Sequence, residues 1–93
     1  MYGTIARIRI DPAKLEELKA FGENMKVGPG QVAGYVYQMD ADPGELFLVA
    51  VFESKEAYWA NAQSPEQHER FMRFRALLLE DPEWHDGAIV SAV

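Results

Sequence analysis

The sequence predicts an α+β domain of the ferredoxin-like type, with strands and helices in the order β-α-β-β-α-β. Three observations lead to this prediction: some segments have the alternation of strands, others have helical spacing, and capping residues mark the helix starts. The expected arrangement is a four-stranded antiparallel sheet with its helices on one face. At 93 residues, the chain is expected to form a single domain, covering 1–93.

The expected strands are identified from their alternation and their apolar content. In the first strand, Tyr2, Thr4, Ala6 and Ile8 share one face, while Ile5 and the neighbouring arginines share the other. The sequence DADPG between the second and third strands has the composition of a tight turn. The last strand is expected in the apolar C-terminal stretch. The four expected strands cover residues 2–10, 32–40, 45–53 and 88–93.

Each expected helix begins at a capping residue. Asp11 precedes Pro12 and an apolar stripe at helical spacing (Leu15, Leu18, Phe21, Gly22 and Met25). Gly22 in this stripe predicts a close approach of helix and sheet, and the loop VGPGQ ends the helix. Ser54 is expected to cap a short helix over KEAYWANAQ. Ser64 and Gln67 are expected to form a capping box at the start of a helix from Pro65 to about Glu80.

The third expected strand is apolar on both faces, which predicts a homodimer. Phe47, Val49 and Val51 point to one side of it, and the residues between them are also apolar. The helices can cover only one face, and soluble monomers rarely leave a large apolar patch exposed. Burial contributes roughly 25 cal/mol per Å² of apolar surface, which favours a second copy over the open face. The alternative is a monomer with an unusually apolar sheet.

Arg7 and Arg9 are expected on the dimer side of the sheet. Glu45 or Glu53 could pair with them there. Such a pair would be structural and would take no part in chemistry.

The composition excludes several classes of function. A net charge of −6 argues against nucleic acid binding, which requires clustered Lys and Arg. The longest apolar run, Leu46 to Phe52, is far too short to span a membrane, and no secretory segment is apparent, so a cytoplasmic location is expected. The absence of cysteine excludes disulfides and a thiol nucleophile, and with two histidines no metal site is expected.

Two stretches, ARIRIDPAKLEELKAF near the start and FESKEAYWANAQSPEQHERF after the third strand, resemble the antibiotic biosynthesis monooxygenase (ABM) family of dimeric α/β-barrel proteins. The resemblance covers essentially the whole chain. Its most specific part is an aromatic strand end, then Ser-Lys-Glu-Ala, then a Ser-Pro helix start. It implies a barrel-like homodimer with a small pocket between sheet and helices in each subunit.

Family members differ in their chemistry, so the resemblance implies the fold more strongly than the reaction. Some oxidise aromatic phenols with O₂ and without metal or flavin, some degrade haem, and some isomerise small metabolites. The haem-degrading branch uses an Asn, a Trp and a His, and the matching positions here are Ala6, Asn61 and Phe71. Haem degradation is therefore not expected.

The candidate site residues lie mainly on the two expected later helices. His68 and Arg75 fall at the edge of the apolar arc of the helix from Pro65, where His68 could accept or donate a proton in the pocket. The alternative is that both are edge residues or contacts at the dimer rim. The solvent face of this helix is assigned to Glu66, Glu69, Arg70, Arg73 and Glu80.

Four further residues are candidates for binding a substrate: Asn61, Trp59, Tyr35 and Phe71. Ordinary packing, or a hydrogen bond to a loop in the case of Asn61, is the alternative for these residues. The sequence Trp84-His85-Asp86 is expected in a loop, and one His beside one Asp does not make a metal site.

Two hypotheses for function follow. The first is a cofactor-independent monooxygenase-like protein that acts on a small hydrophobic, phenolic or polyketide-like molecule. His68 would deprotonate the substrate, which is itself the reductant of O₂, while Asn61, Trp59 and Tyr35 orient it. The second is a non-catalytic homodimer that binds a small apolar ligand.

Overall fold

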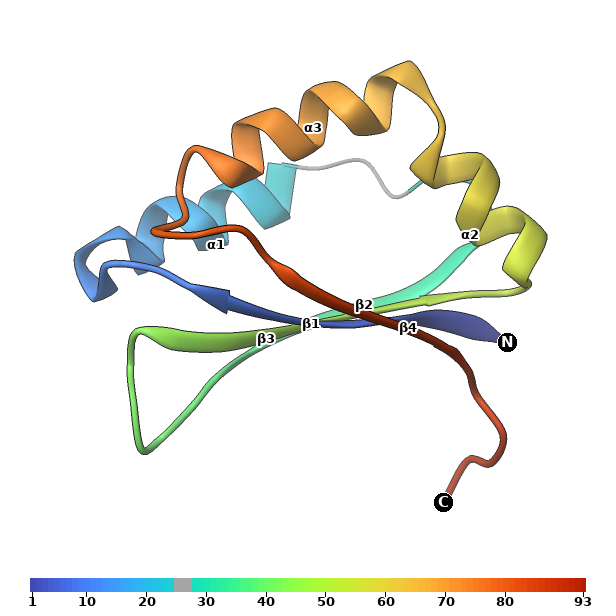
Figure 1. Ribbon diagram of the computed structural model, residues 1–93, viewed down its shortest axis with the longest axis horizontal. Helices are drawn as coiled ribbons and strands as arrows, with labels where there is room; N and C mark the ends of the chain where they lie inside the picture. Colours follow the sequence, from blue (N-terminus) through green and yellow to red (C-terminus); the bar gives the residue numbers. More distant parts are fainter. Residues whose placement is uncertain (25–27) are drawn as a thin grey trace.

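The structure, a computed structural model that describes residues 1–24 and 28–93, is an antiparallel sheet with helices on one face (Figure 1). The strands are β1 (Tyr2–Arg9), β2 (Gln31–Gln38), β3 (Glu45–Phe52) and β4 (Glu83–Ala88), arranged in the order β2-β3-β1-β4. The helical elements are a 3-10 turn (Pro12–Lys14), α1 (Leu15–Asn24), α2 (Lys55–Ala62) and α3 (Pro65–Arg75). The predicted ferredoxin-like fold is confirmed.

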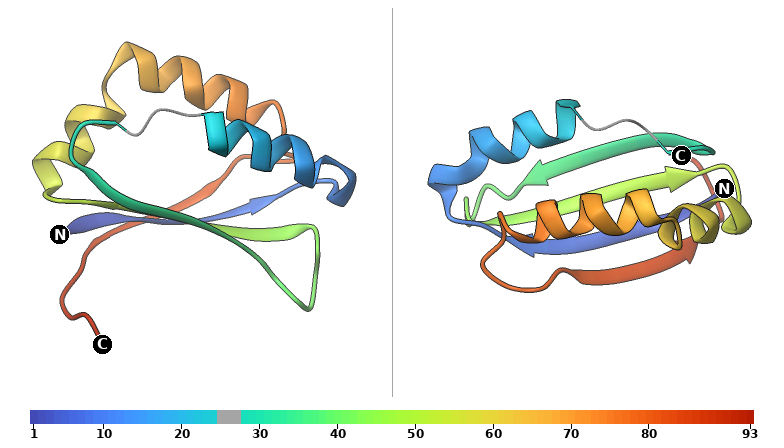
Figure 2. Two further views of the ribbon diagram at one scale, coloured as in Figure 1. Left: turned by 180° about the vertical axis from the view of Figure 1, so that it is seen from behind. Right: turned by 90° about the horizontal axis from the view of Figure 1, so that it is seen from above.

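The core lies between the helices and the inner strands. Ile8 pairs with Leu46 across β1 and β3, and both side chains are buried beneath α1 and α3. Full burial of each such side chain contributes about 1.5–3 kcal/mol. Figure 2, seen from above, shows α1 and α3 lying across the sheet and α2 at one end of it. The core cluster consists of Ile8, Ile10, Leu18, Leu46 and Leu78.

All three predicted N-caps are present. The Asp11 carboxylate accepts a hydrogen bond from the backbone N–H of Ala13 at 3.0 Å, and Ser54 Oγ accepts one from Ala57 at 3.1 Å. Ser64 Oγ accepts one from the N–H of Gln67 at 3.1 Å. The predicted capping box is only half right, because the Ser64 N–H bonds to the carbonyl of Asn61 instead of the Gln67 side chain.

The last strand lies earlier than predicted. β4 is Glu83–Ala88, so Trp84, His85 and Asp86 lie in a strand and not in a loop. Pairing with β1 decides this, because Trp84 lies opposite Ala6 and Gly87 opposite Gly3. Residues 89–93 leave the sheet on the side away from the helices (Figure 1), with Val90 and Val93 exposed.

Two further predictions about the helices are wrong. α3 ends at Arg75 and not near Glu80, because the chain turns there and the Leu79 N–H bonds to the carbonyl of Arg9 at 2.9 Å. A Cβ added to Gly22 would meet nothing within 4 Å, so no close approach to the sheet explains this glycine. The predicted stripe residue Met25, and Val27 of the predicted loop, lie outside the described residues.

The sheet face away from the helices is open and apolar. Ile5, Tyr35 and Tyr37 are 51%, 58% and 54% exposed there, although their side chains are large and apolar or aromatic. The expected ion pair is present for Arg7, whose Nε lies 2.6 Å from Glu45 Oε2. Arg9 instead pairs with Asp42 at 2.9 Å, and not with Glu45 or Glu53. The open face is defined here as Ile5, Tyr35, Tyr37, Phe47, Val49 and Val51.

In the part of the chain that the structure describes, no helix has the length and apolar character needed to cross a membrane.

Candidate functional site

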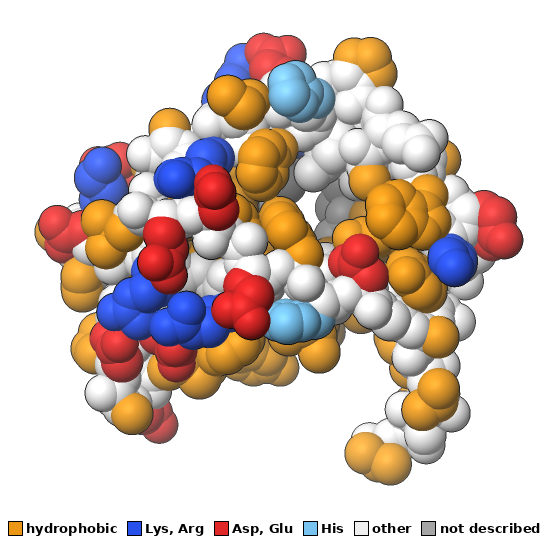
Figure 3. Space-filling view, in the orientation of Figure 1, with side chains coloured by type: hydrophobic (Ala, Val, Ile, Leu, Met, Phe, Trp, Pro, Cys, Tyr) orange, Lys and Arg blue, Asp and Glu red, His pale blue; other side chains and the backbone are white. Residues whose placement is uncertain are grey.

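The helices and the sheet enclose a hollow in which two cavities meet. Figure 3 shows this side of the molecule hollowed between the helices and the sheet, with hydrophobic side chains around the opening. One cavity has a volume of about 570 Å³ and the other about 120 Å³. Arg70 lines both cavities, so they adjoin at this side chain.

The smaller cavity is apolar and aromatic. Its walls come from α1, β2, β3, α3 and β4, and the rings of Phe71 and Trp84 lie 6.3 Å apart in it. An apolar cavity of roughly 150 Å³ can admit benzene, so this one is close to the size of a single aromatic ring. The described residues that line it are Leu18, Phe21, Gly22, Val36, Leu48, Gln67, Arg70, Phe71, Phe74 and Trp84, and of these only Arg70 is charged.

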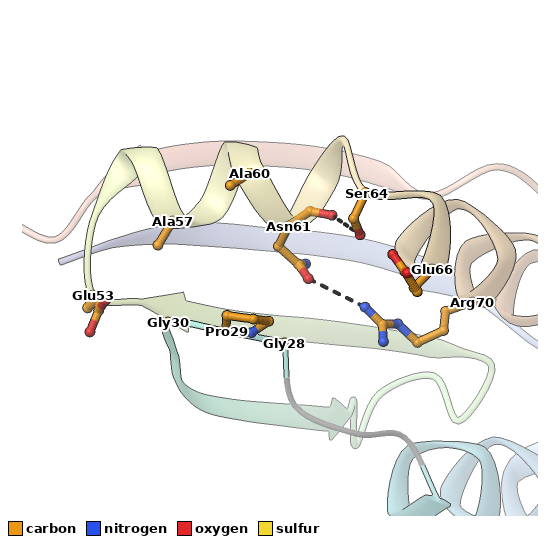
Figure 4. A pocket seen from close by; sticks show the side chains of 10 residues that line it. All are labelled: Gly28, Pro29, Gly30, Glu53, Ala57, Ala60, Asn61, Ser64, Glu66 and Arg70. Atoms are coloured by element: carbon orange, nitrogen blue, oxygen red, sulfur yellow. Dashed lines mark hydrogen bonds between the residues drawn. The ribbon is translucent and has the colours of Figure 1, made fainter.

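The larger cavity lies between α2, the start of α3 and the loop before β2 (Figure 4). Two glycines let this loop come close to α2. A Cβ at Gly28 would collide with the Asn61 amide, and one at Gly30, which has a φ of 81°, would press on Ala57. The cavity is lined by Gly28, Pro29, Gly30, Glu53, Ala57, Ala60, Asn61, Ser64, Glu66 and Arg70.

A polar cluster of Asn61, Gln67 and Arg70 separates the two cavities. Gln67 Oε1 accepts hydrogen bonds from Arg70 Nε at 3.2 Å and from Arg70 Nη2 at 3.0 Å. Arg70 Nη2 also donates to Asn61 Oδ1 at 3.4 Å, as Figure 4 shows. The cluster forms because α2 ends at Ala62 and Ser64 starts α3 at once, which brings the end of one helix against the first turns of the next.

A second polar contact joins α2 to β4. The Tyr58 hydroxyl donates a hydrogen bond to Asp86 Oδ1 at 2.7 Å, and the Tyr58 ring packs on Tyr2 and Phe52. Burial and then the hydrogen bond to Asp86 raise the pKa of Tyr58 to about 12. Tyr58 is therefore a neutral hydrogen-bond donor at neutral pH and holds the end of α2 to the sheet.

The raised pKa of Tyr58 predicts a loss of stability at high pH. The folded-state pKa lies above the unfolded value of about 10, so the contribution is complete below pH 10 and is lost as the pH rises through 12. Ultraviolet titration of tyrosinate in the folded protein should show a late ionisation step near pH 12, which belongs to Tyr58. Tyr58→Phe should remove this late step, whereas Tyr37→Phe should keep it. A late step that survives in Tyr58→Phe would contradict the assignment.

Solved structures of other proteins share this fold. A protein of Chloroflexus aurantiacus, provisionally named an antibiotic biosynthesis monooxygenase, superimposes with a TM-score of 0.78 at 26% identity, over 99% of this chain and 95% of that one. The fold is that of the antibiotic biosynthesis monooxygenases. SnoaB, a cofactor-independent oxygenase from Streptomyces nogalater, is 17% identical with a TM-score of 0.77, over 99% of this chain and 95% of that one.

A Bordetella bronchiseptica protein with the same provisional name reaches a TM-score of 0.81 at 18% identity, over 97% of both chains. No protein-family model matches the sequence, and no curated protein matches it. The resemblance to the ABM family is therefore confirmed at the level of the fold.

Within this ABM-type fold, two of the six candidate residues line the cavities. Asn61 lines the larger cavity and Phe71 the apolar one. His68 and Trp59 are exposed and line neither. Arg75 also lines neither, and it pairs with Asp81 at 2.6 Å. Tyr35 lies opposite Val49 on the open face, so it cannot face a pocket between the sheet and the helices of its own subunit.

Sequence reasoning missed Arg70, Gln67 and Trp84. Arg70 was assigned to the solvent face of its helix, yet it is half-buried and reaches the hollow. Its spacing of three residues from Gln67 is a signal that could have indicated a side-chain pair. Among the described residues, no group of three or more His, Asp or Glu side chains is placed to hold a metal ion.

Proposed function

We propose that this chain is an ABM-like monooxygenase that oxidises a small hydrophobic, aromatic molecule bound in the hollow. The observation that carries the proposal is the apolar cavity, whose walls include Phe71 and Trp84 and whose boundary is the polar cluster around Arg70. An apolar cavity with a few convergent polar groups is the usual form of a small-molecule site. The name of the Chloroflexus aurantiacus protein, which shares this fold, supports monooxygenation as the class of reaction.

In this proposal the substrate is the reductant of O₂. A phenol or anthrone that loses a proton becomes an electron-rich anion, and the conversion of CH₂ and O₂ to C=O and water needs no further reductant. The guanidinium of Arg70 stabilises the anion, and Asn61 and Gln67 hold the guanidinium in place. Glu53 and Glu66 line the larger cavity, where they can accept the released proton.

The test is O₂ uptake with a panel of anthrones, quinols and flavonoids. We expect turnover of at least one of them, and we expect His68→Ala to change it by less than about twofold because His68 is exposed and lies outside both cavities. Loss of turnover in His68→Ala would show that the chemistry takes place elsewhere. Absence of turnover across the panel would favour the binding protein described next.

The second candidate function is a non-catalytic protein that binds a small apolar ligand. One observation favours it: among the described residues, those that line the two cavities include no His, Tyr or Lys, and their titratable groups are Glu53, Glu66 and Arg70. The range of general acid–base chemistry open to such a site is narrow.

We further propose that the protein is a homodimer joined through its open face. The face is too apolar for a free surface, and the exposed apolar tail at 89–93 leaves the sheet on the same side (Figure 1). A second copy would cover both. The hollow lies on the opposite side of the sheet and would remain accessible.

A further inference from the structure

We propose that Arg70 is the anchor for an anionic group, and that the ligand of this site is an aromatic carboxylate whose ring enters the apolar cavity. The inference rests on the proposed function for the place of binding, and it adds the charge and size of the ligand.

The first observation is that Arg70 has no carboxylate partner. Each of the other four arginines has one within ion-pair distance: Arg7 with Glu45, Arg9 with Asp42, Arg73 with Glu69, and Arg75 with Asp81. Among the described residues, no acidic side chain forms an ion pair with Arg70, although the chain carries 15 acidic residues and a net charge of −6. A half-buried cation without a counterion favours the arrival of an anion.

The second observation is that Arg70 is fixed in position by neutral groups. The side-chain oxygen of Gln67, Oε1, accepts hydrogen bonds from Nε and Nη2 of Arg70. The side-chain oxygen of Asn61, Oδ1, lies 3.4 Å from Nη2. No hydrogen bond is made by Nη1 to any described residue. The guanidinium is therefore oriented while its charge is kept, and one of its amino groups remains free. A planar guanidinium held in this way suits a carboxylate.

The third observation concerns where the anion can lie. Glu53 and Glu66 line the larger cavity and would repel an anion there, whereas Arg70 is the one charged side chain among the described residues that line the apolar cavity. At about 120 Å³, the apolar cavity suits one aromatic ring. A ring packed against Phe71 and Trp84 in this cavity would bring an attached carboxylate toward Arg70, which lines both cavities.

The test compares acids with amides of the same shape by isothermal titration calorimetry. The ligands are benzoate and 4-methylbenzoate against benzamide and 4-methylbenzamide, and the proteins are the wild type, Arg70→Gln and Arg73→Gln. Arg73 is the matched control because it lies one turn away on α3, is exposed, and pairs with Glu69 at 2.7 Å.

We expect the wild type to bind the acids at least about tenfold more tightly than the amides, since a hydrogen bond between two charged groups is roughly twice as strong as one between neutral groups. Arg70→Gln should remove this preference by weakening the binding of the acids, while Arg73→Gln should keep it. If Arg70→Gln does not fold, the wild type decides alone: added salt should weaken binding of the acids and not of the amides. Equal binding of acids and amides, no binding of either, or an equal loss in both variants would overturn the inference.

The outcomes for ligand charge and for catalysis are separable. Binding of acids through Arg70 without any O₂ uptake would leave the anion site standing and refute the monooxygenase. Oxidation of neutral phenols together with equal binding of acids and amides would support the monooxygenase and refute the anion site.

Discussion

Val49→Asp is expected to convert the protein from a dimer to a monomer. Val49 lies on the inner strand β3, with Ile5 opposite it on β1 and Tyr35 opposite it on β2, so it occupies the middle of the open face. An aspartate there would be buried without a partner in the dimer, which costs several kcal/mol per subunit. A loss of about 4 kcal/mol would weaken association by about a thousandfold.

Sedimentation equilibrium at micromolar concentration measures this change. The wild type is expected at about twice the chain mass of 10.5 kDa, and Val49→Asp at the mass of one chain. Met72→Asp is the control, because Met72 is an exposed apolar residue on α3, outside the open face. A folded wild type that sediments at the mass of one chain would show that the open face has no partner copy.

The parts of the fold that could be predicted are those where local chemistry and pairing agree. Alternation located β1, and the caps Asp11, Ser54 and Ser64 fixed the starts of the helical segments because their side chains bond to nearby backbone N–H groups. β4 was misplaced because its residues, such as His85 and Asp86, are polar, and only pairing with β1 makes them a strand. Among the apolar residues that follow, the Ile89 N–H still bonds to the Met1 carbonyl at 2.9 Å, but none of them belongs to a strand of the subunit.

The site was harder to predict than the fold, since it depends on how α3 sits above the sheet. Phe71 was identified because an aromatic residue in an apolar stripe turns inward. Arg70 was counted with the solvent-facing charges, although its long side chain reaches the hollow and is held there by Gln67. His68 was a candidate because an imidazole can transfer a proton near neutral pH. It lies on the exposed side of α3, which takes it away from the hollow.

Val36→Phe is expected to abolish binding of aromatic ligands, with a loss of affinity of at least about a hundredfold, or 2.7 kcal/mol. Val36 lines the apolar cavity, and a cavity of about 120 Å³ cannot hold both a phenyl side chain and a ligand ring. β2 is an edge strand, so the strain of the larger side chain is expected to remain within about 1–3 kcal/mol. Val32→Phe is the matched control, because Val32 lies on the same strand, is exposed, and lines neither cavity.

Binding in the apolar cavity is measured most directly by the indole N–H signals of the two tryptophans, in a nitrogen-15 NMR titration with phenol. Trp84 lines the apolar cavity, whereas Trp59, on α2, lines neither cavity. If the hollow between helices and sheet is the ligand site, the Trp84 signal will shift in the wild type and in Val32→Phe, and the Trp59 signal will stay in place. In Val36→Phe, the Trp84 signal will not shift. A Trp84 signal that does not move while binding is detected elsewhere, at Trp59 or on the open face, would contradict the assignment of the site.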